Sequence, residues 1–424
     1  MPVPRNFAKS RHASELAPDR GAVLSTTFQD RFLTNDLLFS IIFSFCSPAT
    51  IIRFSRTCRI ADLVVKSYMK RTYRIERILS RFLSDPLKFR RLQAGTGTLI
   101  SGSAALQFFD RSFYPESDLD LYVHVQFAKE VGIFLLEDGY VFAPNSVQED
   151  DFAEISDEQT IRSLPSSYTF KGVSCVFTFE KKHHSSGEPL KVQLIVGTHC
   201  PMEVILYFHS TCVMNVISFE TAYSLYPKAT FEKRQSLVCP GTGRDEDAAL
   251  QKYENRGWTM ATTDLTWARD LEPCFHIVYH RVRFMGDSFC WTIPLDISMI
   301  PDRLDPGEGS PRLLKDPAAA TSWTLDYSVD DWGCISIQRK SNKNLYLHYI
   351  TSCKDMLQSL EESPQTRRRV SEPRYTALKL IQRKKYYDAA YVSMCMMSFR
   401  FNSDMQALLR DTNSYDPIDG FGDL

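Results

Sequence analysis

Two short stretches decide the fold of the larger part of this chain: LISGSAAL, from Leu99 to Leu106, and SDLDLYV, from Ser117 to Val123. The first predicts a short strand that turns directly into a helix at Gly102-Ser103, and the second predicts a strand rich in β-forming residues. Asp118 and Asp120 stand two residues apart on that strand, so both carboxylates point to one face. The sequence therefore predicts a strand–turn–helix unit beside a carboxylate pair.

This combination suits the binding of a metal-bound nucleotide. Gly102 lets the backbone approach a phosphate group, and Ser103 at the start of the helix offers N–H and O–H donors to it. Asp118 and Asp120 are placed to hold Mg²⁺ against the triphosphate. The competing interpretation is a pair of loop-capping carboxylates on an unrelated α/β domain.

The two stretches resemble the signature of the polymerase-β-like nucleotidyltransferase superfamily, over about residues 95–217. The resemblance implies a third carboxylate on a neighbouring strand. That strand is predicted at Leu190 to Val196, where neutral Gln193 takes the expected position, and Glu180 at the end of the preceding strand is the candidate substitute. We therefore expect a degenerate domain that needs no cofactor, with weak Mg²⁺ binding at best. The alternative is an active Mg-dependent nucleotidyltransferase with Asp118 and Asp120 as metal ligands.

A second pattern lies upstream, where apolar residues recur at helical spacing and give a wide apolar face. Ser47-Pro48 is an N-cap followed by a first-turn proline, which predicts a second helix. A third is expected from Arg59 to about Met69. Three short helices cannot bury this much apolar surface among themselves, so the excess should pack on a neighbour or a partner. The predicted partner-binding residues are Leu33, Leu37, Leu38, Ile41, Ile42, Phe45, Ile51 and Ile52.

The order of these elements, ending in Thr57-Cys58-Arg59, resembles the F-box. The sequence departs from that motif at Thr34, where proline is usual, and in lacking the late tryptophan, to which Tyr68 is the nearest aromatic residue. The resemblance implies binding to the adaptor subunit of a cullin-RING ubiquitin ligase and, through the rest of the chain, to a protein substrate. The alternative is an ordinary helical subdomain packed on its neighbour.

Length and charge divide the chain further. Its 424 residues suggest two or three domains, and 43% apolar with 24% charged residues is ordinary for a globular protein. Residues 1–91 carry 17 basic and 7 acidic residues, whereas the remainder carries 33 basic and 44 acidic. We predict an α+β protein with a disordered tail at 1–32, an F-box-like module at 33–75, a nucleotidyltransferase-like domain at 76–240, and a region of short strands and helices at 241–424.

Some of the basic residues are regularly spaced: Lys66, Lys70, Arg74, Arg77 and Arg81 fall on one face of a predicted helix. Such a face can track phosphates, but we expect a solvated or domain-bridging surface and no nucleic-acid partner. The 11 cysteines lack a C-x-x-C pair, the start lacks an apolar signal segment, and the longest apolar run is far too short to span a bilayer. We therefore expect a cytoplasmic or nuclear protein with no membrane attachment.

Overall fold

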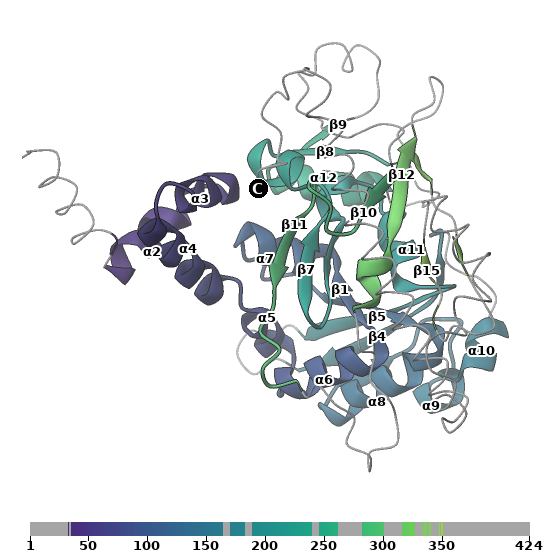
Figure 1. Ribbon diagram of the computed structural model, residues 1–424. Helices are drawn as coiled ribbons and strands as arrows, with labels where there is room; N and C mark the ends of the chain where they lie inside the picture. Colours follow the sequence, from purple (N-terminus) through teal and green to yellow (C-terminus); the bar gives the residue numbers. More distant parts are fainter. Residues whose placement is uncertain are drawn as a thin grey trace, which may run out of the picture. The chain divides into compact units, whose positions relative to one another are not determined.

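The computed structural model describes residues 33, 35–163, 170–182, 189–239, 246–261, 282–300, 316–326, 334–336, 339–340, 347 and 349–350. The chain divides into two compact units, 1–70 and 71–424, each described here by itself (Figure 1). Together they contain helices and a mixed sheet, as the α+β prediction requires. The predicted tail at 1–32 and most of the residues after 300 lie outside the described residues.

The first unit consists of three helices, α2 (Asp36–Ser44), α3 (Pro48–Ser55) and α4 (Arg59–Thr72), whose end passes the unit boundary. The Asn35 side chain caps α2 by accepting hydrogen bonds from the backbone N–H groups of Leu37 and Leu38, both at 3.1 Å. The predicted start at Ser47-Pro48 is confirmed, because the Ser47 hydroxyl accepts from the Thr50 N–H and Pro48 is the first helical residue.

The core of the first unit is aromatic. Phe43 is 3% exposed, and its ring centroid lies 5.7 Å from that of Phe39, 5.5 Å from Phe54 and 5.2 Å from Tyr68. Two residues predicted to face a partner belong to this core instead, since Leu33 and Ile51 are 4% and 1% exposed. The prediction was wrong there because apolar periodicity alone does not say which apolar residues pack inside the unit.

The second unit begins with α5 (Ile75–Phe82) and α6 (Pro86–Thr96). The prediction of one continuous basic helix from Lys66 to Arg81 is therefore wrong. The helix breaks at Tyr73, which is buried with its ring 5.5 Å from Phe108 and 5.4 Å from Trp291. Helix α6 was not predicted, although Asp85-Pro86 marks its start and a left-handed Gly97 its end.

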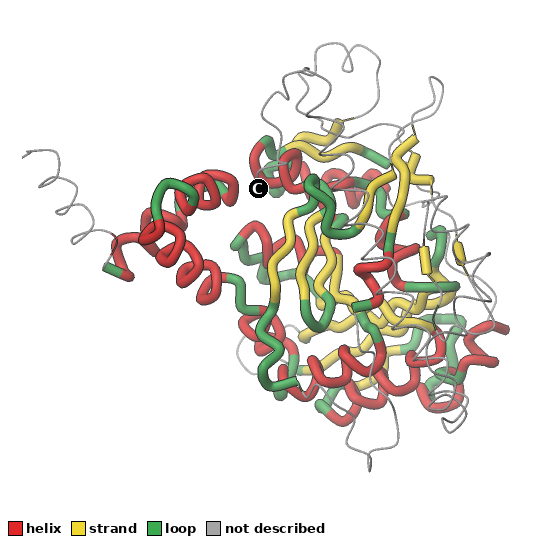
Figure 2. The backbone as a smooth tube through the Cα atoms, viewed as in Figure 1, coloured by secondary structure: helices red, strands yellow, loops and turns green. Residues whose placement is uncertain are grey.

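An eight-stranded mixed sheet organises the second unit, in the order β11-β7-β6-β1-β2-β5-β4-β3 (Figure 2). Only the pair β2/β5 is parallel among these neighbours. The strands are β1 (Leu99–Ser101), β2 (Leu119–His124), β3 (Val141–Ala143), β4 (Val173–Lys181), β5 (Leu190–Gly197), β6 (Asn215–Ile217), β7 (Thr221–Ser224) and β11 (Trp291–Pro294).

Helices pack on this sheet. Helix α7 (Gly102–Asp110) follows β1 directly, α8 (Ala128–Glu137) packs on β2, β3 and β5, and α11 (Pro201–Leu206) packs on β2 and β5. The short helices α9 (Phe152–Ile155) and α10 (Glu158–Ser163) lie between β3 and β4. Helix α11 ends at Leu206, and residues 215–217 form β6, a central strand whose three residues are all buried.

The later part of the chain packs against the sheet. Trp323, on β12 (Ser322–Asp326), is fully buried in a cluster that also contains Leu99 and Tyr122. Helix α12 (Glu246–Asn255) lies in the region predicted to contain short strands and helices. The remaining strands that the structure describes are β8 (Gln235–Leu237) parallel to β9 (Thr259–Ala261), β10 (Val282–Phe284) with β12 and β13 (Cys334–Ser336), and β14 (Arg339–Lys340) with β15 (Tyr349–Ile350). Among the described helices, none has the length and apolar character needed to cross a bilayer.

Candidate functional site

The strand–turn–helix at Gly102 lies against the aspartate strand. Ser101 of β1 pairs with Asp120 of β2, so the turn into α7 starts beside that carboxylate. Gly102 has φ +64°, a left-handed conformation that favours glycine, and a Cβ added there would lie 2.4 Å from Asp120 Oδ2. Both the backbone and the close approach therefore require glycine at this position.

Asp120 on β2 and Asp118, the residue just before the strand, share one side, while Leu119, Leu121 and Val123 are fully buried on the other. Burial raises the pKa of both carboxyl groups, and for Asp120, where the negative charge of Asp118 adds to it, the pKa reaches about 7. Asp118 is about 35% exposed, and its Oδ2 lies 3.8 Å from Lys191 Nζ. Asp120 is thus the carboxyl group that holds a proton most readily.

The neighbouring strand carries no third acid at the expected place. Gln193 on β5 lies opposite Asp120 on one side and Thr178 on the other. Glu180, the candidate substitute, lies opposite Lys191 and contributes to raising the pKa of Asp118. Two carboxylates beside an ammonium group fit a divalent cation poorly, because the ammonium repels it. Within the described ranges, no cluster of three or more His, Cys, Asp or Glu residues could hold a metal ion.

The Ser103 hydroxyl, expected to face a phosphate, is 5% exposed and contacts residues far away in the sequence. It lies 3.1 Å from the Tyr253 hydroxyl of α12, and Arg256 Nη1 donates a hydrogen bond to it at 3.2 Å. Arg256 also donates to Glu116 Oε1 at 2.6 Å and stacks on the Tyr114 ring at 3.9 Å. No sequence signal linked Tyr253 or Arg256 to the Gly102-Ser103 turn.

The loop before Asp118 is fastened by Arg81. This guanidinium donates hydrogen bonds to the carbonyl oxygens of Tyr114 at 3.0 Å and Ser117 at 3.1 Å, to that of Pro115, and to the Ser117 hydroxyl at 3.3 Å. Arg81 was predicted to lie on a solvated or domain-bridging basic face; it is half-buried against this loop and is not a solvated residue. A planar group with five fixed donors suits such a cluster of carbonyl acceptors, which lysine does not.

Removal of this clamp should be measurable. We expect Arg81→Met to lower the free energy of unfolding of the second unit by about 2 kcal/mol, because hydrogen bonds from a charged donor to partly buried acceptors are lost. Arg81→Lys should recover only part of it. Urea denaturation checks this, with Arg77→Met, which removes an exposed arginine from the same helix, as the matched control. If Arg77→Met destabilised the second unit as much as Arg81→Met does, the hydrogen bonds from Arg81 to the loop would not be the cause.

The first unit carries an apolar surface on α2 and the residue after it. The exposed fractions are 69% for Leu37, 43% for Leu38, 49% for Ile41, 47% for Ile42 and 87% for Phe45. Of the eight predicted partner-binding residues, these five are exposed, Ile52 is half-buried, and Leu33 and Ile51 are buried. We call Leu37, Leu38, Ile41, Ile42 and Phe45 the α2 apolar face.

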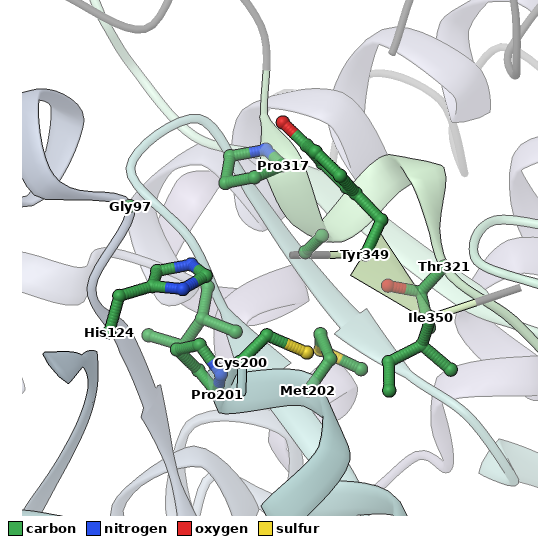
Figure 3. Close-up of a pocket in the computed structure, with 11 residues that line it drawn as sticks. Gly97, His124, Cys200, Pro201, Met202, Pro317, Thr321, Tyr349 and Ile350 are labelled. Atoms are coloured by element: carbon green, nitrogen blue, oxygen red, sulfur yellow. The ribbon is translucent and has the colours of Figure 1, made fainter. Parts of the chain in front are cut away.

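A small pocket lies elsewhere in the second unit, and Figure 3 shows His124, Cys200, Met202 and Tyr349 around it. Its volume of about 20 Å³ has room for roughly one water molecule. Neither the Gly102-Ser103 turn nor the aspartate pair lines it. A nucleotide does not fit there, so this pocket is not the candidate site.

Comparison with known proteins suggests no function, so the function is inferred from the residues of this chain. The α2 apolar face and the Gly102–Asp120 contact are the two features that suggest a function. A scan against protein-family models, a search of curated proteins and a search of solved structures each found no match to this chain.

Proposed function

We propose that this protein is an F-box-type substrate receptor of a cullin-RING ubiquitin ligase. In this proposal the first unit binds the adaptor subunit, and a degenerate nucleotidyltransferase-like domain recognises a protein substrate. The observation that carries it is the α2 apolar face, five large apolar side chains exposed between residues 37 and 45. The proposed compartment is the cytoplasm or nucleus.

The α2 apolar face suits recognition in an apolar groove. Phe39 and Phe43 fix the opposite face of the helix in the core of the unit, so the exposed face is already ordered before a partner arrives. Full burial of one Leu, Ile or Phe side chain contributes about 1.5–3 kcal/mol. Burying such a helix face in a hydrophobic groove is a recurring mode of protein recognition.

The proposal also rests on how the second unit departs from a transfer site. Gln193 supplies no charge beside Asp120, and Lys191 lies where a cation would have to bind. The alternative is a Mg-dependent nucleotidyltransferase using Asp118 and Asp120, favoured by the contact between Gly102 and Asp120. The deciding assay is incubation with labelled nucleoside triphosphates and Mg²⁺ or Mn²⁺. Incorporation by wild type but not by Asp118→Asn or Asp120→Asn would establish the alternative, and loss in Glu180→Gln would identify the third acid.

Adaptor binding can be tested on the α2 apolar face. We expect Leu38→Glu with Ile41→Glu to reduce affinity for the adaptor on the order of 100-fold or more, because two carboxylates would enter an apolar interface. The measurement is co-purification and titration with the recombinant adaptor subunit. The matched control is Met299→Glu, which places the same charge at a 62% exposed apolar residue of the second unit. Failure of the wild-type protein to capture the adaptor would refute the proposal.

We infer that the basic residues from Lys66 to Arg81 are not a nucleic-acid surface. Lys66 pairs with Asp62 at 2.7 Å, and Arg81 is engaged by the loop before Asp118. Salt-dependent RNA or DNA binding that is lost on Lys70→Glu with Arg74→Glu would overturn this inference.

A further inference from the structure

Two acidic side chains at the candidate site form ion pairs with cationic side chains of the same protein. Lys191 Nζ lies 3.8 Å from Asp118 Oδ2, and Arg256 Nη2 lies 2.6 Å from Glu116 Oε1. Burial raises the pKa of Asp118 and Asp120, and the charge of Lys252 on α12 opposes this rise, so Lys252 also acts on this cluster. The positive charge comes from β5 on one side and from α12 and the residue after it on the other.

The same helix covers the turn that a phosphate would need. The Ser103 hydroxyl is buried under Tyr253 and Arg256, which both hydrogen-bond with it. Helix α12 is firmly held there, since Tyr253 is 6% exposed and the following Trp258 is 2% exposed with its indole N–H donated to the Thr230 carbonyl at 2.9 Å. Strand β9 continues from it and pairs with β8.

We propose that the chain compensates its own carboxylates at this site, with Lys191 in the place of a divalent cation and α12 in the place of a phosphate. The inference concerns the degenerate domain of the proposed function and does not depend on adaptor binding. It makes the site a built-in ion cluster that joins β2, β5 and α12, and it predicts that Lys191 adds to the lack of a third acid in keeping divalent cations from the site.

Lys191 is the residue on which exclusion depends. Mg²⁺ coordinates carboxylate oxygens at about 2.0–2.1 Å, so an ion on Asp118 Oδ2 would lie within a few ångströms of an ammonium group now 3.8 Å from that oxygen. Repulsion between a divalent and a monovalent cation at such a distance cancels part of the attraction that the two carboxylates offer, and so weakens a site that already lacks a third acid. Without the Lys191 ammonium group, strand β5 contributes no positive charge near Asp118, Asp120 and Glu180.

The test is Mn²⁺ binding to the full chain, followed by water-proton paramagnetic relaxation and by the melting temperature. We expect saturable Mn²⁺ binding by Lys191→Met and none by wild type over the same concentration range. The apparent affinity of the variant for Mn²⁺ should then exceed that of the wild type by about tenfold or more. Asp118→Asn in the Lys191→Met background should remove the gained binding. Two controls should behave as wild type: Lys191→Arg, which keeps the positive charge, and Lys88→Met, which breaks an exposed ion pair with Glu137 elsewhere.

Two results would overturn the inference. One is saturable Mn²⁺ binding by wild type that disappears in Asp118→Asn, and the other is a folded Lys191→Met protein that binds Mn²⁺ no better than wild type. Lys191→Gln, which keeps a polar side chain, serves if the methionine variant does not fold. Adaptor capture is measured on the same samples and should be equal in all of them. Loss of capture in every sample, wild type included, refutes the receptor function and leaves the ion-cluster result standing.

Discussion

Replacing Gly102 with alanine is expected to lower the free energy of unfolding of the second unit by about 3 kcal/mol. A left-handed backbone costs an L-residue roughly 1–2 kcal/mol, and the new Cβ would meet the Asp120 carboxylate, so one of the two must move. Urea denaturation at neutral pH measures the change. Gly95→Ala on α6 is the matched control, because nothing lies within 4 Å of a Cβ there and alanine should be neutral or stabilising by up to about 1 kcal/mol.

The clash can be separated from the backbone effect by a second substitution. In an Asp120→Gly background the carboxylate is gone, so Gly102→Ala should cost only the backbone part, about 1–2 kcal/mol. A double-mutant cycle then gives the coupling between the two positions. Strict additivity of the two substitutions would show that the alanine does not meet Asp120.

The second large effect is expected at Asp316, a 1% exposed carboxyl group that connects the segment before β12 to the sheet. Its Oδ2 lies near the hydroxyls of Ser218 and Tyr223, the latter at 3.0 Å, and its Oδ1 accepts from the Ala318 N–H at 2.9 Å. The Ser218 hydroxyl also donates to the Thr221 carbonyl oxygen, with 2.9 Å between the two oxygen atoms, and its single proton cannot serve both acceptors. A protonated Asp316 carboxyl group would supply the further proton that the hydrogen bond between Asp316 and Ser218 needs. Burial raises the pKa of Asp316 to about 7.

Because the folded pKa is raised above the ordinary value of 3.8, the stability contribution of Asp316 is full below about pH 4 and is lost as the pH rises through about 7. The loss is at most about 4 kcal/mol, from 1.36 kcal/mol per pKa unit. We expect Asp316→Asn to remove this part of the pH dependence, since the amide stays neutral and can donate to Ser218. Urea denaturation from pH 4 to 8 measures it.

The matched control for that experiment is Asp157→Asn. Hydrogen bonds from Thr160 lower the pKa of Asp157, so its contribution has the opposite sign and is lost as the pH falls. The wild-type slope between pH 4 and 7 should therefore persist in Asp157→Asn. If it persists in Asp316→Asn as well, then Asp316 is not the group that titrates.

The placement of the side chains at the candidate site could be predicted from the sequence by the geometry of β-strands. Period-two alternation put Asp118 and Asp120 on one face, and the parallel pairing of β2 with β5 brings Gln193 opposite Asp120, as the sequence predicted. The roles proposed for these side chains remain predictions. Tyr253 and Arg256 escaped notice because their contact with Ser103 spans about 150 residues and follows no periodic pattern.

Elsewhere the limits of prediction have a common cause. Leu33 and Ile51 are buried in the core of the first unit whereas Leu37 and Ile41 are exposed, and all four are equally apolar, so only the packed structure distinguishes them. Residues 215–217 form a strand buried on both faces, and such a strand carries no alternation by which it could be recognised. In both places the deciding information lies in other segments of the chain.

The pairing of β1 with β6 also sets an order of events during synthesis on the ribosome. All the core contacts of the first unit lie between residues 33 and 69, so this unit can fold as soon as that segment emerges. The second unit has to wait, because Ile100 pairs with Ile217 and β7 is joined at the sheet edge by β11, at residues 291–294. The helical unit is therefore complete while the sheet is still being assembled, and a nascent chain presents its α2 apolar face well before a finished second unit exists.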